Sequence, residues 1–255
     1  YEKISQQHEK IDRIQVSHSE MHDLILETGI DQAKVFQIPI GINLDYFSFK
    51  NKPESQRIRK KLGIPQSAVV IGSFQKDCNG MGTGMTPKHI KGPDIFLKTL
   101  KQLKRRIPEI HVLITGPARG YIKKGLSELK IPYTHTLIKH YPEIGRLYQA
   151  LDLYIVTSRQ EGGPKAVLES MASGVPLITT RVGQAMDLVE HEQNGWMVES
   201  EDVDGLAHWA EWVVANPSSA NRAANQARMT AEQNSYFQLT GKWKALMEGF
   251  VDARL

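Results

Sequence analysis

The sequence has 255 residues, of which 40% are hydrophobic and 24% charged, a composition typical of a soluble globular chain with room for one domain and part of another. It contains no apolar run of about 18 residues and no signal-like segment, which argues against a membrane span and secretion, and its single cysteine, Cys78, excludes an internal disulfide and favours a reducing cytoplasm. The net charge of +4 is mild and comes without a nucleic-acid-binding motif, so we expect no nucleic-acid partner.

The first 40 residues predict a helix, a strand, a second helix and a second strand. The second helix covers residues 20–29, where Gly29 marks its end. Residues 41–56 carry turn residues, an early proline and no sustained periodicity, so we interpret them as a linker. The sequence therefore predicts a domain boundary near Gly41.

After this linker, apolar strand-like runs alternate with helical segments. Strands are predicted at 67–74, 109–116, 131–138, 151–158, 175–183 and 194–198. Helices are predicted at 57–63, 93–106, 120–130, 143–150, 184–191 and 202–217, and two more at 218–233 and 236–255. Such alternation predicts an α/β fold with a doubly wound parallel sheet and a ligand crevice at the carboxyl ends of the strands.

Residues 76–91 form a long polar loop with glycines at positions 80, 82 and 84. A loop of this length inside a compact domain tends to be functional or mobile. Its glycines lack the Lys-Ser/Thr pair of a Walker loop and the spacing of the dinucleotide fingerprint, so a classical phosphate loop is not indicated. The pair Lys91-Gly92 then opens the helix at 93–106.

The stretch from Ser158 to Gly174 joins the predicted strand at 151–158 to a short helix. Pro164 suits the first turn of this helix, and Gly174 suits the position just past its end. The helix is otherwise small or apolar, which predicts that it packs against the sheet. Its carboxylate, Glu169, gains nothing from burial unless a partner pairs with it.

A second carboxylate, Glu161, lies in the loop before this helix. Between the two glutamates lie the backbone amides of Gly162, Gly163, Lys165 and Ala166. The free end of a helix carries partial positive charge and unpaired donors, so a phosphate or a sugar hydroxyl can bind there. We expect Glu169 to reach a diol such as a ribose and Glu161 to accept from hydroxyls nearer the loop. Helix capping and solvation are the alternative interpretation of the two glutamates.

This pattern, SRQEGGPKAVLESMASG followed by VPLITTRVG and a later NGWMV, resembles the donor site of retaining GT-B glycosyltransferases of family GT4. The stretch IPIGINLDYF and the Lys91-Gly92 pair also match that family, and the resemblance covers about residues 16–250. It implies four parts. They are a remnant of an N-terminal acceptor domain (1–40), a linker (41–56), a nucleotide-sugar-binding Rossmann-like domain forming one half of a GT-B fold (57–235), and a C-terminal crossing helix (236–255).

The activity that the resemblance implies is transfer of a hexose from a UDP-, GDP- or ADP-sugar to an acceptor hydroxyl with retention. The acceptor would be a glycan or glycolipid, bound through the missing domain, as in polysaccharide or glycolipid biosynthesis. The enzyme would be cytoplasmic or peripheral to the inner face of the membrane, and this fragment alone would be inactive. No cofactor or metal is expected, because lysines can serve in place of a chelated metal ion. A nucleotide-sugar-binding module without transferase activity, or a GT-B-type epimerase, is the alternative function.

The resemblance also implies roles for particular residues. Lys91, which binds the donor diphosphate in the family, and Glu161 would be catalytic. The family usually has Gly-Arg after the first strand, whereas Ser73 follows Gly72 here, so Lys76 either supplies the missing charge or is solvated loop. The predicted substrate-binding residues are Gly72, Ser73, Lys76, Lys91, Leu137, Ile138, Glu161, Gly162, Gly163, Pro164, Lys165, Ala166 and Glu169. Of these, Leu137 and Ile138 would contact the base, or else belong to the core.

Overall fold

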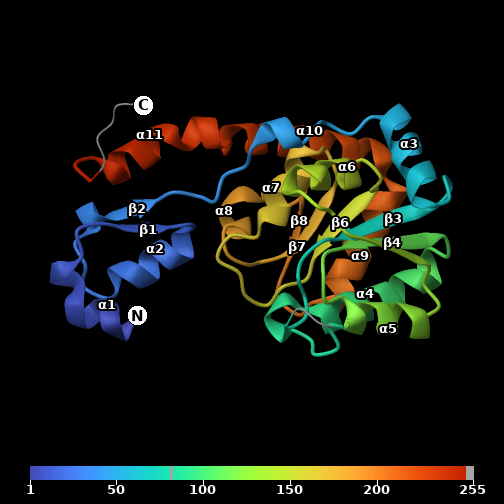
Figure 1. Ribbon diagram of the computed structural model, residues 1–255, viewed down its shortest axis with the longest axis horizontal. Coiled ribbons are helices and arrows are strands. Elements are labelled where there is room, and N and C mark those ends of the chain that lie inside the picture. Colours follow the sequence, from blue (N-terminus) through green and yellow to red (C-terminus); the bar gives the residue numbers. More distant parts are fainter. Residues whose placement is uncertain (81–82, 251–255) are drawn as a thin grey trace.

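The larger part of the protein is built on a six-stranded parallel sheet, shown by a computed structural model that describes residues 1–80 and 83–250 (Figure 1). Its strands are β3 (Val69–Ser73), β4 (Ile110–Thr115), β5 (Tyr133–Thr136), β6 (Leu153–Val156), β7 (Leu177–Thr180) and β8 (Trp196–Val198). The strand order β5-β4-β3-β6-β7-β8 runs outward in opposite directions from the β3–β6 pair. This is the doubly wound arrangement that the alternating sequence predicted, with its topological switch point between β3 and β6.

The inner strands are buried on both faces. All residues of β4, β6 and β7 are buried, as expected for runs of apolar and β-branched residues in a parallel sheet with helices on both sides. The register places Gly72 of β3 between Leu113 of β4 and Tyr154 of β6. A side chain at Gly72 would overlap the side chains of Leu151 and Tyr154, so this glycine lets both pack closely against the centre of the sheet.

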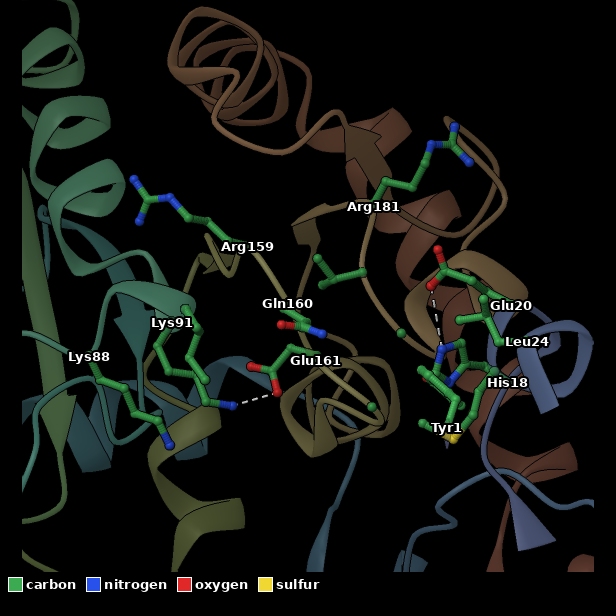
Figure 2. Close-up of a pocket in the computed structure, with 15 residues that line it drawn as sticks. Tyr1, His18, Glu20, Leu24, Lys88, Lys91, Arg159, Gln160, Glu161 and Arg181 are labelled. Atoms are coloured by element: carbon green, nitrogen blue, oxygen red, sulfur yellow. Dashed lines mark hydrogen bonds and ion pairs between the residues drawn. The ribbon is translucent and has the colours of Figure 1, made fainter. Parts of the chain in front are cut away.

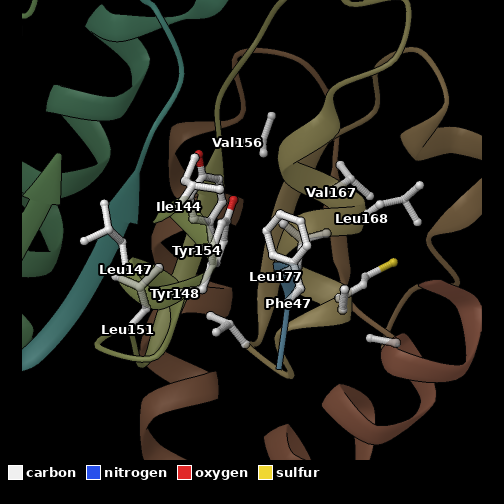
Figure 3. Packing of buried hydrophobic residues seen from close by; sticks show 14 of the residues in the cluster. Phe47, Ile144, Leu147, Tyr148, Leu151, Tyr154, Val156, Val167, Leu168 and Leu177 are labelled. Atoms are coloured by element: carbon white, nitrogen blue, oxygen red, sulfur yellow. The ribbon is translucent and has the colours of Figure 1, made fainter. Parts of the chain in front are cut away.

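Helices cover both faces of this sheet. They are α3 (Lys52–Leu62), α4 (Pro93–Arg106), α5 (Gly120–Glu128), α6 (Ile144–Tyr148), α7 (Lys165–Ala172), α8 (Ala185–Leu188), α9 (Val203–Ala215) and α10 (Pro217–Gln233). One apolar cluster joins α6, α7 and α10 to the sheet around Phe47, Tyr148 and Tyr154 (Figure 3). A second cluster, which includes Phe96 and Trp196, joins α4, α5 and α9 to the other face. Burying a large apolar side chain of this kind contributes about 1.5–3 kcal/mol, so both layers are firmly attached.

The N-terminal unit lies at one side of this domain (Figure 1). It contains α1 (Glu2–Gln7), β1 (Ile14–Val16), α2 (Ser19–Leu26) and β2 (Val35–Gln37), in the predicted order of helix, strand, helix and strand. Its two strands pair in parallel, and it has a small apolar cluster of its own. Helix α11 (Tyr236–Met247) runs from α10 across to this unit, where Arg13 donates hydrogen bonds to the carbonyl oxygens of Leu246 and Glu248, each at 2.7 Å.

Short 3-10 turns complete the chain. They are η1 (His8–Lys10), η2 (Gln32–Lys34), η3 (Leu44–Tyr46), η4 (His89–Lys91) and η5 (Tyr141–Glu143). Among the described residues, no helix is long and apolar enough to cross a membrane.

Several predicted boundaries are wrong by a few residues. Helix α3 begins at Lys52, inside the predicted linker 41–56, because the Asn51 side chain accepts a hydrogen bond from the amide of Glu54 and Pro53 suits the first turn. Strand β5 is shorter than the predicted 131–138. Of the predicted helix at 236–255, residues 248–250 form a turn, and residues 251–255 lie outside the described part.

We predict that Gly92→Ala lowers the free energy of unfolding by about 2–4 kcal/mol. Gly92 has φ +62°, and a Cβ there would overlap the carbonyl oxygen of Thr157 at the end of β6. Urea denaturation measures the effect, and Gly63→Ala is the matched control. Gly63 has φ +68° but open space around it, so its replacement should cost only about 1 kcal/mol of backbone strain. Equal losses at the two positions would show that the contact with Thr157 is unimportant.

Candidate functional site

A cleft of about 480 Å³ lies between the N-terminal unit and the loops that follow the strands (Figure 2). One wall comes from the start of the chain and from α2, including His18, Glu20 and Leu24. The other wall comes from η4, the β6–α7 loop and the β7–α8 loop. The cleft therefore lies where ligands bind in doubly wound sheets, at the carboxyl ends of the strands.

Lys91 and Glu161, the two residues predicted to be catalytic, form an ion pair in this cleft. The Nζ atom of Lys91 lies 2.5 Å from Oε2 of Glu161, and the hydroxyl of Ser158 donates to Oε1 at 2.8 Å. The Glu161 side chain is only 10% exposed. Because the chain places Lys91 at the end of η4 and Glu161 after β6, the sheet brings together residues that are 70 positions apart. As a unit, this pair carries no net charge.

The loop around Gly162 and Gly163 is held tightly between the two parts of the protein. The carbonyl oxygen of Gly162 accepts hydrogen bonds from Ser17 Oγ at 3.1 Å and from the Gln184 amide at 3.0 Å. A side chain at Gly163 would overlap Ile40. The two glycines thus allow the backbone of this loop to approach the N-terminal unit closely. The same lack of side chains leaves room for a ligand beside the loop.

Helix α7 begins directly after this loop. Pro164 occupies the N-cap position, and no side chain caps the helix. The backbone amides of Lys165 and Ala166 have no preceding turn with which to bond, so they remain available as donors, whereas that of Val167 donates to the carbonyl oxygen of Pro164 at 3.0 Å. Together with the partial positive charge of the helix start, this geometry suits an anion.

Glu169 lies in α7 and is only 4% exposed, and two tyrosine hydroxyls hold its carboxylate. Tyr141 donates to Oε1 at 2.6 Å and Tyr148 donates to Oε2 at 2.9 Å. Burial raises the pKa of Glu169, and these two hydrogen bonds oppose that rise. Burial beside Glu169 also raises the pKa of both tyrosines, so they stay protonated as donors. Tyr141 itself is 43% exposed, so one of the two hydroxyl donors to this buried carboxylate belongs to a side chain at the surface.

Gly72 and Ser73, predicted to bind substrate, are packed against protein atoms, and substrate binding by these residues stays a prediction. Ser73 is 1% exposed. Its carbonyl oxygen accepts a hydrogen bond from Arg119 Nη1 at 2.9 Å, and its hydroxyl oxygen accepts one from Nη2 at 3.3 Å. The structure thus places an arginine at the end of β3, but this arginine comes from the segment that follows β4.

Arg119 forms a buried ion pair with Asp77, which the sequence analysis did not identify. Nη2 of Arg119 lies 2.9 Å from Oδ2 of Asp77, and the two side chains are 0% and 1% exposed. Burial raises the pKa of Asp77, and the guanidinium of Arg119 acts against that rise. No local pattern in the sequence indicates this pair, because the partners lie in separate loops.

The glycine-rich loop is folded back on itself beside this ion pair. The amide of Asn79 donates to the carbonyl oxygen of Thr86 at 3.0 Å, and the amide of Tyr121 in α5 donates to that of Gly84 at 2.7 Å. A side chain at Gly84 would overlap Ala118. Gly80 and Gly84 both have positive φ, whereas Gly82 lies outside the described residues. Within the described part, the loop therefore has a defined conformation and packs against the start of α5.

The remaining predicted residues lie around the edge of the site. Lys76 is exposed at the start of the loop, and Lys88 rather than Lys76 lines the cleft. Leu137 is 65% exposed just after β5, whereas Ile138 is half-buried against the core. Contact of these two residues with a base stays a prediction.

The cleft also contains cations that the sequence analysis did not assign. Arg159 binds both oxygens of Asp94, at 2.9 and 2.8 Å, and also pairs with Glu201. These contacts lower the pKa of Asp94, mainly through the hydrogen bonds from Arg159. Arg159 lies 65 positions from Asp94 and 42 from Glu201, so no local pattern in the sequence indicates this pairing.

The fold and the cleft define a Rossmann-like domain, one half of a GT-B fold. Residues 86–230 match the family model of glycosyl transferases group 1, and the chain belongs to this family. It is 28% identical over 195 residues to a D-inositol 3-phosphate glycosyltransferase of Corynebacterium urealyticum, covering 71% of this chain and 44% of that protein. A lipopolysaccharide core biosynthesis mannosyltransferase, LpsB of Rhizobium meliloti, is 23% identical over 223 residues, covering 82% of this chain and 61% of that protein.

Solved structures of glycosyltransferases share the fold. Anabaena HepE in complex with UDP-glucose aligns with a TM-score of 0.76 and 20% identity, covering 94% of this chain and 63% of that chain. The chain thus spans about half the length of the curated relatives that it matches.

Proposed function

We propose that this chain is the donor half of a retaining glycosyltransferase that binds a UDP-, GDP- or ADP-sugar and supports hexose transfer to an acceptor hydroxyl. The observation that carries the proposal is the Lys91–Glu161 pair, which faces the cleft beside the uncapped start of α7. A cation, free amides and a carboxylate at one point suit a diphosphate joined to a polyhydroxylated sugar. Membership in glycosyl transferases group 1 supports the same reaction class.

In the proposed complex, Lys91 and the first amides of α7 contact the diphosphate and stabilise the negative charge that develops as it leaves. Glu161 accepts hydrogen bonds from the sugar. Glu169 binds the ribose diol at Oε1, where Tyr141 now donates. We propose that lysine charge serves this step in place of a metal.

The proposal extends to the whole protein. Residues 1–40 would belong to an acceptor domain, and α11 would cross back to it. Two relatives, an inositol phosphate glycosyltransferase and a lipopolysaccharide mannosyltransferase, support a glycolipid or glycan acceptor in polysaccharide or glycolipid biosynthesis. Such a reaction takes place in the cytoplasm, with peripheral contact at the membrane where the acceptor is a lipid.

Calorimetric titration tests the donor half directly. The purified 255 residues are titrated with UDP, GDP, ADP and their sugar adducts. We expect saturable binding of one nucleoside diphosphate. A folded protein that binds none of them would overturn the proposal. A binding module without transferase activity is distinguished by assaying a longer chain of the same protein for transfer.

We predict that the 255 residues alone bind the nucleotide but show no acceptor-dependent turnover. The cleft has only a small N-terminal unit as its second wall, so little surface orients an attacking hydroxyl or excludes water from the reacting bond. Proximity and desolvation together can account for several kcal/mol of barrier. Nucleotide release is measured with and without acceptor. Release that rises with added acceptor would contradict the proposed domain organisation.

A further inference from the structure

The cations that line the cleft differ in whether they have acidic partners. Lys91 pairs with Glu161, Arg159 pairs with Asp94 and Glu201, and Arg181 pairs with Glu199 at 2.7 Å. The side chain of Lys88 has no acidic partner within the described part of the chain. Lys88 is thus a cleft cation whose charge no acidic side chain among the described residues compensates through an ion pair.

The backbone holds Lys88 in a fixed place beside Lys91. Its amide donates to the carbonyl oxygen of Asp77 at 2.8 Å, and its own carbonyl oxygen accepts from the amide of Lys91 at 2.8 Å. Asp77 is in turn held by the buried pair with Arg119. In Figure 2 the Lys88 and Lys91 side chains leave the same turn and extend toward the loop that carries Glu161. Both ammonium groups therefore face the same region of the cleft.

The charge of the proposed ligand requires a second cation there. A nucleoside diphosphate carries at least two negative charges at neutral pH, as expected from the charge of a single phosphoryl group. The Lys91–Glu161 pair is neutral as a unit, and the start of α7 supplies only about half an elementary charge. A ligand that met these groups alone would leave much of its charge unbalanced in a partly enclosed cleft.

We infer that Lys88 is a second diphosphate-binding residue, acting together with Lys91. This inference rests on the proposed function, and it assigns to Lys88 the role that the sequence suggested for Lys76. Lys88 contacts the diphosphate as a point charge, so its contribution is sensitive to salt and tolerates arginine.

Calorimetry on variants of the 255-residue protein tests this assignment. The probes are the nucleoside diphosphate that the wild type binds and the corresponding nucleoside, each at low and high salt. Lys88→Ala should weaken diphosphate binding about tenfold or more and reduce its salt dependence, while nucleoside binding stays the same. Lys88→Arg should keep most of the affinity. Lys98→Ala, at an exposed lysine of α4 outside the cleft lining, is the matched control and should change the affinity less than about twofold, whereas Lys76→Ala tests the alternative assignment.

The outcomes separate the inference from the proposed function. Wild-type protein that is folded but binds no nucleoside diphosphate overturns both. Wild-type binding that Lys88→Ala leaves unchanged, or equal losses for diphosphate and nucleoside, overturns the inference alone. A large loss in Lys76→Ala with none in Lys88→Ala returns the role to Lys76. Thermal unfolding of each variant confirms that the comparison is made between folded proteins.

Discussion

Replacing Arg119 by alanine is expected to lower the free energy of unfolding by about 3–5 kcal/mol, because it leaves the carboxylate of Asp77 buried without its partner. The substitution also removes the hydrogen bonds from the guanidinium to the carbonyl oxygens of Ser73 and Thr115. These groups join the end of β3, the end of β4 and the glycine-rich loop. Urea denaturation at neutral pH measures the loss.

The pH dependence gives this prediction a second test. Burial raises the pKa of Asp77, and removal of Arg119 takes away the charge that opposes the rise. A carboxyl whose pKa is raised by folding binds more protons in the folded state, so the folded state loses stability as the pH rises from the unfolded pKa to the folded pKa. The cost of Arg119→Ala should therefore be smaller near pH 4 than at pH 7.

A double replacement separates the loss of the ion pair from the loss of volume. Arg119→Met combined with Asp77→Leu removes both charges and keeps the space filled, and such exchanges of buried pairs are often neutral or stabilising. We expect the double variant to recover most of the loss. If Arg119→Ala costs less than about 1 kcal/mol at pH 7, the pair does not hold this loop in place.

The architecture followed from local patterns in the sequence. The apolar, β-branched run at 151–158 contains β6, and Gly174, with φ +66°, lies past the end of α7 as predicted. Alternation of such strands with helices is sufficient for a doubly wound sheet, because short parallel connections leave few other arrangements. Helix boundaries were predicted less well where a side chain caps the helix start. Asn51 is an example, since its capping extends α3 into residues without apolar periodicity.

The contacts inside the site could not be predicted in the same way. Glu169 clearly needed a partner, but tyrosine hydroxyls supply it, and no charge pattern indicates Tyr141 or Tyr148. The choice between Lys76 and Lys88 depends on how the glycine-rich loop folds back, and this fold depends on Arg119 from another part of the chain. Such pairings are long-range, so local periodicity carries no information about them.

Replacing Lys91 by alanine is expected to weaken nucleoside diphosphate binding by about 1–3 kcal/mol, which is roughly fivefold to 150-fold, because a charge-assisted hydrogen bond is lost. The structure adds a second effect. Glu161 is only 10% exposed and keeps the hydrogen bond from Ser158 but loses its cation, so a carboxylate without an ion-pair partner then faces the incoming phosphate. Repulsion between the Glu161 carboxylate and the phosphate groups should make the loss of affinity larger for the diphosphate than for the nucleoside.

A double variant separates the two effects. Lys91→Ala with Glu161→Gln removes the unpaired charge, so it should unfold at a higher temperature than Lys91→Ala and regain the part of the affinity that repulsion removed. It should not regain the part that the ammonium group provides, because a glutamine cannot supply a positive charge. Calorimetry with the diphosphate and the nucleoside, together with thermal unfolding, resolves both parts. If the double variant binds the diphosphate as tightly as the wild type does, Lys91 serves to neutralise Glu161, and the phosphate contact must come from other groups.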